Sequence, residues 1–301
     1  MDAPVELLRQ LLPGVVQIHA AIPRDHPSAK ILGTERMGSG VIVDAAGLIL
    51  TVNYVIMGAQ TVHVALTEGR RIKAEVVGQD FDVGLALVRI KRQGLQSAVL
   101  GSGEALERGD AVVAVAATGA HERRVSGGIV TYLGEFEAYW EYLLDQGIVS
   151  SASNPGYGGG ALFTRTGYLV GIVSLNLNGI VRNSLAIPVE CYRRHEQEFL
   201  RYGRVVSRPP RAWLGVFAHV VEEGVVVAGV VPDGPGDKSG LQEGDLIVSL
   251  NAAEVGSRRD LYLSLWRHQP GERLTIEVVR DSKVRRVDVT GGDRAEFFRA
   301  P

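Results

Sequence analysis

Hydrophobic residues between Val15 and about Ile187 come in short runs rich in valine and isoleucine, separated by turn sequences such as Asp44–Gly47 and Glu68–Gly69. Short apolar runs at this spacing are typical of the strands of an all-β sandwich or barrel. The segments that fit the pattern are Gly38–Val43, Leu48–Val52, Thr61–Leu66, Lys73–Val77, Leu85–Ile90, Ala111–Ala116, Arg123–Leu133 and Leu169–Leu177. The pattern therefore predicts a mainly β unit over this part of the chain.

Helical segments flank the β unit. Val5–Leu12 has helical spacing and ends at Pro13, and Val189–Tyr202 has helical spacing after Pro188. Proline is tolerated at a helix start but not in its interior, which sets these limits. The following segment, Gly203–Arg211, is rich in arginine and proline and is predicted to be a linker.

A second unit is predicted from Ala212 to about Thr290. Its candidate strands are Leu214–Val221, Val225–Val231, Leu246–Leu250 and Leu274–Val279. One segment, Arg258–His268, has helical spacing, and Leu261 and Leu265 lie four residues apart on one of its faces. We therefore expect a β domain over residues 1–202, a linker over 203–211, a small α+β domain over 212–290 and a polar tail over 291–301.

Composition supports a globular protein with more than one domain. The 301 residues are 46% hydrophobic and 22% charged, which is enough apolar material to form sizeable cores. Lys and Arg total 32 against 34 Asp and Glu, for a net charge of −2, and no long block of one sign occurs. Nucleic acid is therefore not expected as a partner. The single cysteine, Cys191, excludes an internal disulfide framework and a multi-cysteine metal site.

Membrane and export signals are not evident in the sequence. No stretch of about 18 apolar residues occurs, so no membrane span is expected. The N-terminus lacks the basic and apolar regions of a secretory leader. The chain as written is therefore expected in the cytoplasm, or in the cell envelope or periplasm if a leader or anchor has been removed.

Five motifs of the β unit, taken in order, resemble the HtrA group of trypsin-like proteases. They are Gly38–Asp44, Gly47–Ile56, Asp80–Val88, Asn154–Phe163 and Leu185–Pro188. In the second unit, Trp213–Val216 and Gly240–Asn251 resemble the PDZ module that follows the protease domain in that group. The resemblance implies a trypsin-like double barrel of two six-stranded β-barrels, followed by a PDZ domain.

The positions that match the family's catalytic triad carry other residues. The resemblance places Tyr54 where the family has its general base, Gly84 at the orienting acid and Gly158 at the nucleophilic serine. Acyl transfer by such a triad needs a hydroxyl nucleophile and a base with a pKa near the working pH. A tyrosine titrates near pH 10 in model peptides, so Tyr54 is expected to keep its proton at neutral pH.

The same comparison identifies Gly156, Tyr157 and Gly158 as the remnant of the oxyanion loop. Because glycine allows many backbone shapes, this loop is expected to be loosely preorganised. The sequence therefore predicts that the chain is not an enzyme but a pseudoprotease, a catalytically inactive serine protease homologue.

Two alternatives to this prediction stay open. The first is a serine-type endopeptidase or other hydrolase with a non-standard or borrowed nucleophile, and the second is a metal- or ligand-binding module in the vacated cleft. Cys191 is the lone thiol, and Asp80 and Asp82 could form an acid pair or simply cap a turn. The histidines show no metal-binding spacing, so neither a metal nor another cofactor is expected.

The PDZ-like half keeps the residues that such a module needs to bind peptides. In PDZ modules an extended peptide adds a strand to a sheet edge, and backbone N–H groups of a tight turn capture its terminal carboxylate. The residues predicted to bind peptide are Trp213, Leu214, Gly215, Val216, Leu261 and Leu265, although the four aliphatic ones could equally be plain core. The main hypothesis is a scaffold or regulator that binds C-terminal or extended peptides, with an active protease paralogue as a further candidate partner.

Overall fold

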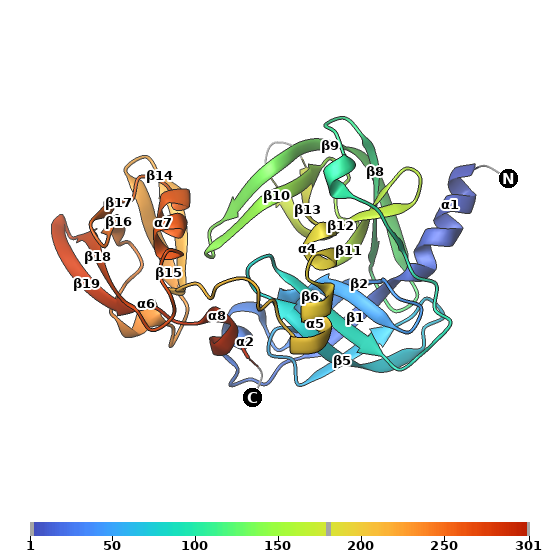
Figure 1. Cartoon of the computed structure of the whole chain (residues 1–301), viewed down its shortest axis with the longest axis horizontal. Coiled ribbons are helices and arrows are strands. Elements are labelled where there is room, and N and C mark those ends of the chain that lie inside the picture. The colour runs from blue at the N-terminus through green and yellow to red at the C-terminus, as the bar shows by residue number, and fades with distance from the viewer. Residues whose placement is uncertain (1–2, 179–181, 300–301) are drawn as a thin grey trace.

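The first barrel comprises the strands that the N-terminal pattern predicts. The computed structural model describes residues 3–178 and 182–299, so residues 1–2 of the expected first domain and 300–301 of the expected tail lie outside it. Six strands close this barrel in the order β1-β2-β3-β6-β5-β4 (Figure 1). Their bounds are β1 Val15–Ala21, β2 Glu35–Ile42, β3 Leu48–Val52, β4 Thr61–Ala65, β5 Arg71–Asp80 and β6 Leu85–Ile90.

A second barrel follows, built from a seven-stranded sheet in the order β11-β8-β9-β10-β13-β12-β7, with a β11–β12 pairing that closes the ring. The strands are β7 Val99–Leu100, β8 Ala111–Ala117, β9 Arg123–Ala138, β10 Tyr142–Ser150, β11 Gly160–Thr164, β12 Tyr168–Asn178 and β13 Arg182–Pro188. One hydrophobic cluster runs from the first barrel, for example Ile49, to Phe163 and Ile172 of the second. Removal of this apolar surface from water holds the two barrels together. The strand order confirms the predicted double six-stranded β-barrel.

The C-terminal domain is a twisted antiparallel sheet in the order β14-β15-β16-β18-β19, with a short β17 paired to β16. Its strands are β14 Val216–Val221, β15 Gly224–Val230, β16 Leu246–Leu250, β17 Ala253–Glu254, β18 Arg273–Arg280 and β19 Lys283–Thr290. The domain stands beside the barrels, and the hairpin formed by β9 and β10 reaches across to it (Figure 1). The small α+β unit predicted after the linker is confirmed, and β14 forms one edge of its sheet.

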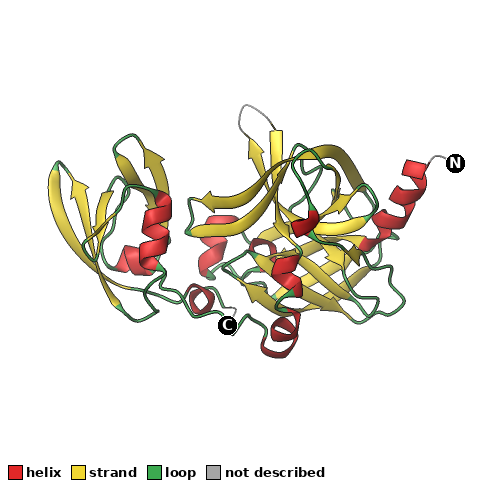
Figure 2. Ribbon diagram, turned by 45° about the horizontal axis from the view of Figure 1, so that its top comes forward, coloured by secondary structure: helices red, strands yellow, loops and turns green. Residues whose placement is uncertain are grey.

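Helices are short, and strands make up a larger part of the molecule than helices do (Figure 2). They are α1 Ala3–Leu11, α2 Pro27–Leu32, α3 Asn53–Ile56, α4 Glu190–Arg193, α5 Glu196–Tyr202, α6 Pro235–Lys238, α7 Arg258–Leu265 and α8 Arg294–Phe297. The single helix predicted over residues 189–202 is wrong, because His195 leaves helical geometry at φ −123° and separates α4 from α5. The helix predicted to run to His268 ends at Leu265.

The tail is not the polar end that the sequence predicts. Phe298 is buried, and its ring lies 6.4 Å from that of Phe81 in the first barrel and 5.5 Å from that of Trp213 in the C-terminal domain. The end of the chain therefore packs at the junction between the two domains, where its two phenylalanines find apolar partners that sequence spacing does not indicate.

Candidate functional site

The three positions predicted at the cleft meet around one short helix, α3. Tyr54 belongs to α3, and the backbone N–H of its neighbour Asn53 donates to the carbonyl of Gly84 over 2.9 Å. Gly158 lies in the loop that precedes β11, and a Cβ atom added there would lie 1.9 Å from the Tyr54 hydroxyl. The structure thus places Gly158 against the Tyr54 hydroxyl and Gly84 against the neighbouring residue, Asn53.

The Tyr54 side chain fills the space between the barrels. Its hydroxyl donates a hydrogen bond of 2.8 Å to the carbonyl of Ser174, and Arg36 donates to the backbone carbonyl of Tyr54 over 2.8 Å. Burial raises the pKa of Tyr54 to about 12, so the phenol stays protonated at neutral pH. The phenol can therefore donate a hydrogen bond but cannot act as a general base under these conditions.

The loop at residues 156–158 is better ordered than its glycine content predicts. The N–H of Tyr157 donates to the carbonyl of Ala117 over 3.0 Å, and the N–H of Ser39 donates to the carbonyl of Gly158 over 2.7 Å. The Ser39 hydroxyl also donates to the Tyr157 carbonyl over 2.8 Å. The expectation of a loosely preorganised loop is wrong, because hydrogen bonds from the neighbouring strands hold the loop backbone.

The turn predicted to capture a carboxylate holds one in the structure. Leu214 donates its N–H to Oε2 of Glu141 over 3.0 Å, and Gly215 and Val216 donate theirs to Oε1 over 2.7 and 2.9 Å. Gly215 has φ +76°, a left-handed conformation that glycine adopts without strain. Glu141, only 2% exposed, lies at the tip of the β9–β10 hairpin, and no motif or spacing in the sequence indicates its role.

The aliphatic residues predicted to line the peptide groove are all buried. Leu214, Val216, Leu261 and Leu265 belong to the core of the C-terminal domain, and Leu143 of the β9–β10 hairpin packs into the same cluster. They thus contribute to the core, and a side chain of the barrel domain covers them. Trp213 is buried too, against Phe297 and Phe298.

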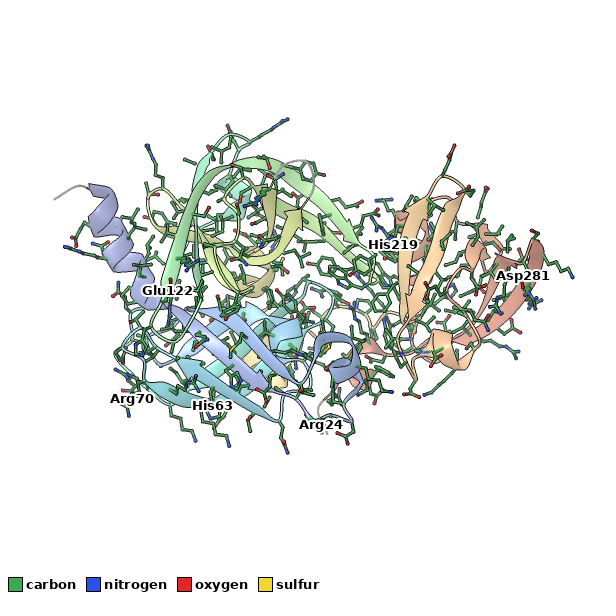
Figure 3. The ribbon with its side chains drawn as sticks, turned by 180° about the vertical axis from the view of Figure 1, so that it is seen from behind. Arg24, His63, Arg70, Glu122, His219 and Asp281 are labelled. Carbon is green, nitrogen blue, oxygen red and sulfur yellow. The ribbon has the colours of Figure 1, made fainter. Side chains whose placement is uncertain are left out.

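An apolar cavity of about 400 Å³ joins the barrel cleft to the C-terminal domain. Its lining includes Tyr54, Met57, Trp140, Trp213 and Phe217. On the domain side, His219 of β14 lies at the junction with the barrels (Figure 3), with its ring 5.2 Å from that of Tyr139. The cleft and the peptide groove are therefore neighbouring parts of one interdomain region.

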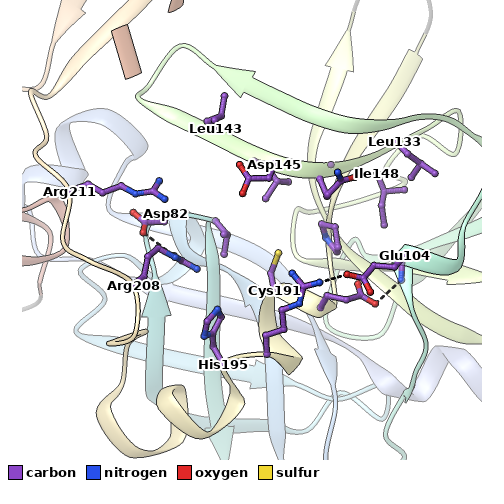
Figure 4. A pocket seen from close by; sticks show the side chains of 18 residues that line it. Asp82, Glu104, Leu133, Leu143, Asp145, Ile148, Cys191, His195, Arg208 and Arg211 are labelled. Atoms are coloured by element: carbon purple, nitrogen blue, oxygen red, sulfur yellow. Dashed lines mark hydrogen bonds and ion pairs between the residues drawn. The ribbon is translucent and has the colours of Figure 1, made fainter. Parts of the chain in front are cut away.

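A second pocket, of about 520 Å³, contains the lone cysteine (Figure 4). Burial raises the pKa of the Cys191 thiol to about 12, which keeps it protonated and weakly nucleophilic. Nη1 of Arg208 lies 3.0 Å from Oδ1 of Asp80 and 2.9 Å from Oδ2 of Asp82. Asp80 also accepts the backbone N–H groups of Asp82 and Val83, so this acid pair caps a turn and anchors the linker.

Within residues 3–178 and 182–299 no three His, Cys, Asp or Glu side chains are grouped so as to hold a metal ion. Over the same residues no helix is both long enough and apolar enough to cross a bilayer.

Family profiles match both halves of the chain. A trypsin-like peptidase domain matches residues 38–172, and a PDZ domain matches residues 212–290. A probable periplasmic serine endoprotease, DegP-like, of Ectopseudomonas mendocina (strain ymp) is 32% identical over 293 residues, which cover 91% of this chain and 60% of the relative. A protein of the same name from Hahella chejuensis (strain KCTC 2396) is 34% identical over 261 residues, covering 81% of this chain and 54% of the relative.

Solved structures agree with these matches. The HtrA-type protease AlgW with a tripeptide is 27% identical, with a TM-score of 0.60 over 97% of this chain and 98% of that one. The serine endoprotease from Yersinia pestis is 26% identical, with a TM-score of 0.57 and coverage of 97% and 98%. The chain spans about 60% or less of the length of the curated relatives it matches.

The names of these relatives correct one prediction. The sequence predicts that the chain is not an enzyme, yet its curated relatives are named serine endoproteases and the similar structures are HtrA-type proteases. The prediction of a pseudoprotease is therefore contradicted. It rested on the residue types at three positions, which were taken to outweigh the resemblance of the whole chain to the HtrA proteases.

Proposed function

The chain is a homologue of the HtrA/DegP proteases, with a trypsin-like peptidase domain followed by a PDZ domain, and we propose that it binds the C-terminal ends of polypeptides in its PDZ groove. One observation carries the proposal, namely that the N–H groups of Leu214, Gly215 and Val216 all point at one carboxylate. Backbone N–H groups arranged in this way recognise a terminal carboxylate in peptide-binding domains.

The rest of the groove supports the same ligand class. β14 lies at the sheet edge, so a peptide can extend the sheet by one strand beside it. The side chains around the carboxylate-binding turn, including Leu261 and Leu265, are apolar, which favours a peptide with an apolar last residue. Similar HtrA-type structures are described with a tripeptide and with a decapeptide, which supports peptide capture by this chain as well.

A titration of peptides against the full chain tests the proposal. A fluorescein-labelled heptapeptide ending in valine is expected to bind with its carboxylate free and at least tenfold more weakly when amidated. Gly215→Glu should abolish binding by distorting the turn, because residue 215 has a positive φ and an added Cβ would lie only 3.1 Å from the Trp213 ring. Gly119→Glu, which adds the same charge where nothing lies within 4 Å, is the matched control. Equal binding of free and amidated peptides would remove the proposal.

The names of the relatives favour a second function, hydrolysis of peptide bonds in the periplasm. Gly158 has no side chain and Tyr54 keeps its proton, so hydrolysis by this chain would use a non-standard nucleophile or one supplied by a partner chain. Incubation with unfolded casein, together with a fluorophosphonate probe for serine nucleophiles, tests this function. New fragments without labelling of the chain are the expected result, and intact casein would count against hydrolysis.

A further inference from the structure

The PDZ groove already holds a ligand that comes from the chain itself. We infer that the tip of the β9–β10 hairpin, Tyr139–Leu143, is an internal ligand of this groove and that the carboxylate of Glu141 takes the place of a peptide's terminal carboxylate. The inference rests on the proposed function, because it identifies what an incoming C-terminus must displace.

Glu141 satisfies the carboxylate-binding turn completely. Three N–H groups within 3.0 Å share its two oxygens, and only 2% of the residue is exposed. Glu141 has φ +55°, a backbone conformation that residues other than glycine rarely adopt. Ala138 and Tyr142 pair across the hairpin, so Glu141 is the last residue of a three-residue loop, a position that takes the left-handed conformation in such hairpins. The loop geometry thereby presents the Glu141 side chain at the hairpin tip.

The backbone next to Glu141 makes the contacts of an added strand. The N–H of Ala218 in β14 donates to the carbonyl of Tyr139 over 2.6 Å. The ring of Tyr139 lies 5.9 Å from that of Phe217 and 5.2 Å from that of His219. An aromatic residue two positions before the carboxylate-bearing residue therefore packs on the exposed face of β14, as a side chain of a bound peptide would.

The opposite wall of the groove also holds the hairpin. The Tyr262 hydroxyl on α7 donates to the carbonyl of Ala138 over 2.6 Å and accepts the N–H of Glu141 over 3.0 Å. Two ion pairs join α7 to the hairpin. Nη2 of Arg258 lies 3.0 Å from Oε1 of Glu137, and Nε of Arg259 lies 2.8 Å from Oε1 of Glu135. The hairpin is therefore bound by both elements that would hold a peptide, and its acidic side chains match the arginines of α7.

These contacts define the class of peptide that can compete. It must bring a free carboxylate to the turn, and an aromatic side chain about two residues before its end would take the place of Tyr139. An internal competitor lowers the apparent affinity for such a peptide in proportion to the fraction of molecules in which the groove is open. Removing the Glu141 carboxylate should therefore raise that affinity.

The test compares full-length wild type, Glu141→Ala and the matched control Asp145→Ala, which removes the same charge from an exposed position of the same hairpin. The probe is fluorescein-Gly-Ser-Gly-Ser-Tyr-Ala-Val with a free or an amidated C-terminus. We expect Glu141→Ala to bind the free peptide at least tenfold more tightly than wild type, and Asp145→Ala to bind as wild type does. If wild type binds in a carboxylate-dependent manner and Glu141→Ala is no tighter, the internal ligand is rejected and the proposed function stands. If no variant distinguishes the two peptides, the proposed function fails and the inference fails with it.

Hydrogen exchange on the wild-type chain gives a second test that does not depend on a variant that folds. Saturating free peptide should speed exchange of the amides of residues 138–143 severalfold, because the hairpin leaves the groove. Amides of β14 should stay protected, because the peptide replaces the hairpin as their partner. Unchanged exchange at the hairpin in the presence of bound peptide would overturn the inference.

Discussion

The hydroxyl of Tyr54 lies where the side chain of residue 158 would begin, since a Cβ added to Gly158 would come within 1.9 Å of it. Two non-bonded heavy atoms cannot lie that close, so a side chain at residue 158 would displace the phenol. The tyrosine at one family position and the glycine at the other are therefore a matched pair. The two positions have to be changed together.

Gly158→Ser alone is expected to lower the free energy of unfolding by about 1–3 kcal/mol, as overpacking of a filled site does. The double variant Tyr54→His, Gly158→Ser should recover most of that loss, because the smaller imidazole vacates the space. Urea unfolding of the four variants of this double-mutant cycle measures the coupling. Gly127→Ser, at a position with nothing within 4 Å, is the control and should be close to neutral. Additive losses in the cycle would contradict the pairing.

Gly84 is expected to resist substitution for a different reason. It has φ +80°, whereas an added Cβ would meet no atom closer than 3.5 Å. Gly84→Ala should therefore destabilise by about 1–2 kcal/mol through backbone strain alone. Gly84→Asn should be milder, because asparagine tolerates the left-handed region better. Thermal unfolding compares the two with Gly119→Ala, and equal Tm values for alanine and asparagine at position 84 would show that strain is not the cause.

Much of the fold could be predicted from the chain because its strands are short apolar runs bounded by turns. β3 and β6 have the bounds that the pattern predicts, Leu48–Val52 and Leu85–Ile90. The apolar pattern did not predict β10, because Asp145, Gln146 and Gly147 interrupt its apolar run. The register of that strand shifts between Leu144 and Gly147, and such an irregularity is not visible in a periodic pattern.

At the candidate site, features that depend on neighbouring residues could be predicted from the sequence, and features that depend on residues far apart in the chain could not. The turn at Gly215 could be predicted because its chemistry is encoded in four consecutive residues. Its occupant could not, because Glu141 lies more than seventy residues earlier and reaches the turn only through docking of a hairpin from another domain. The burial of Phe298 depends on the same kind of contact, with Phe81 far away in the chain.

Cys191 is expected to react slowly in the native protein. With a thiol pKa of about 12, only about one molecule in ten thousand carries the thiolate at pH 8. Alkylation by iodoacetamide should therefore be at least a hundredfold slower in the native chain than in the chain unfolded in urea. Mass spectrometry of quenched time points measures both rates. Comparable rates would mean that the thiol is far more acidic or more exposed than the structure indicates.

His26 is expected to make stability depend on pH between about 5 and 7.5. Burial, and to a smaller extent the nearby Arg36, lowers the pKa of His26 below the 6.5 that is usual for histidine. Its Nδ1 accepts the N–H of Ser28 at the start of α2, a bond that protonation would break. At pH values between the two pKa values, the unfolded chain binds a proton at His26 and the native chain does not. The stabilisation of the native state by neutral His26 is therefore complete above pH 6.5. It is lost as the pH falls through the folded-state pKa.

The variant His26→Asn separates this titration from capping, because asparagine also caps helices but does not titrate. Its Tm should fall less than that of wild type between pH 7.5 and 5, whereas His121→Asn, at an exposed position, should follow wild type. Differential scanning calorimetry at several pH values makes the comparison. Parallel curves for wild type and His26→Asn would show that folding does not lower the pKa of His26, which would contradict this prediction.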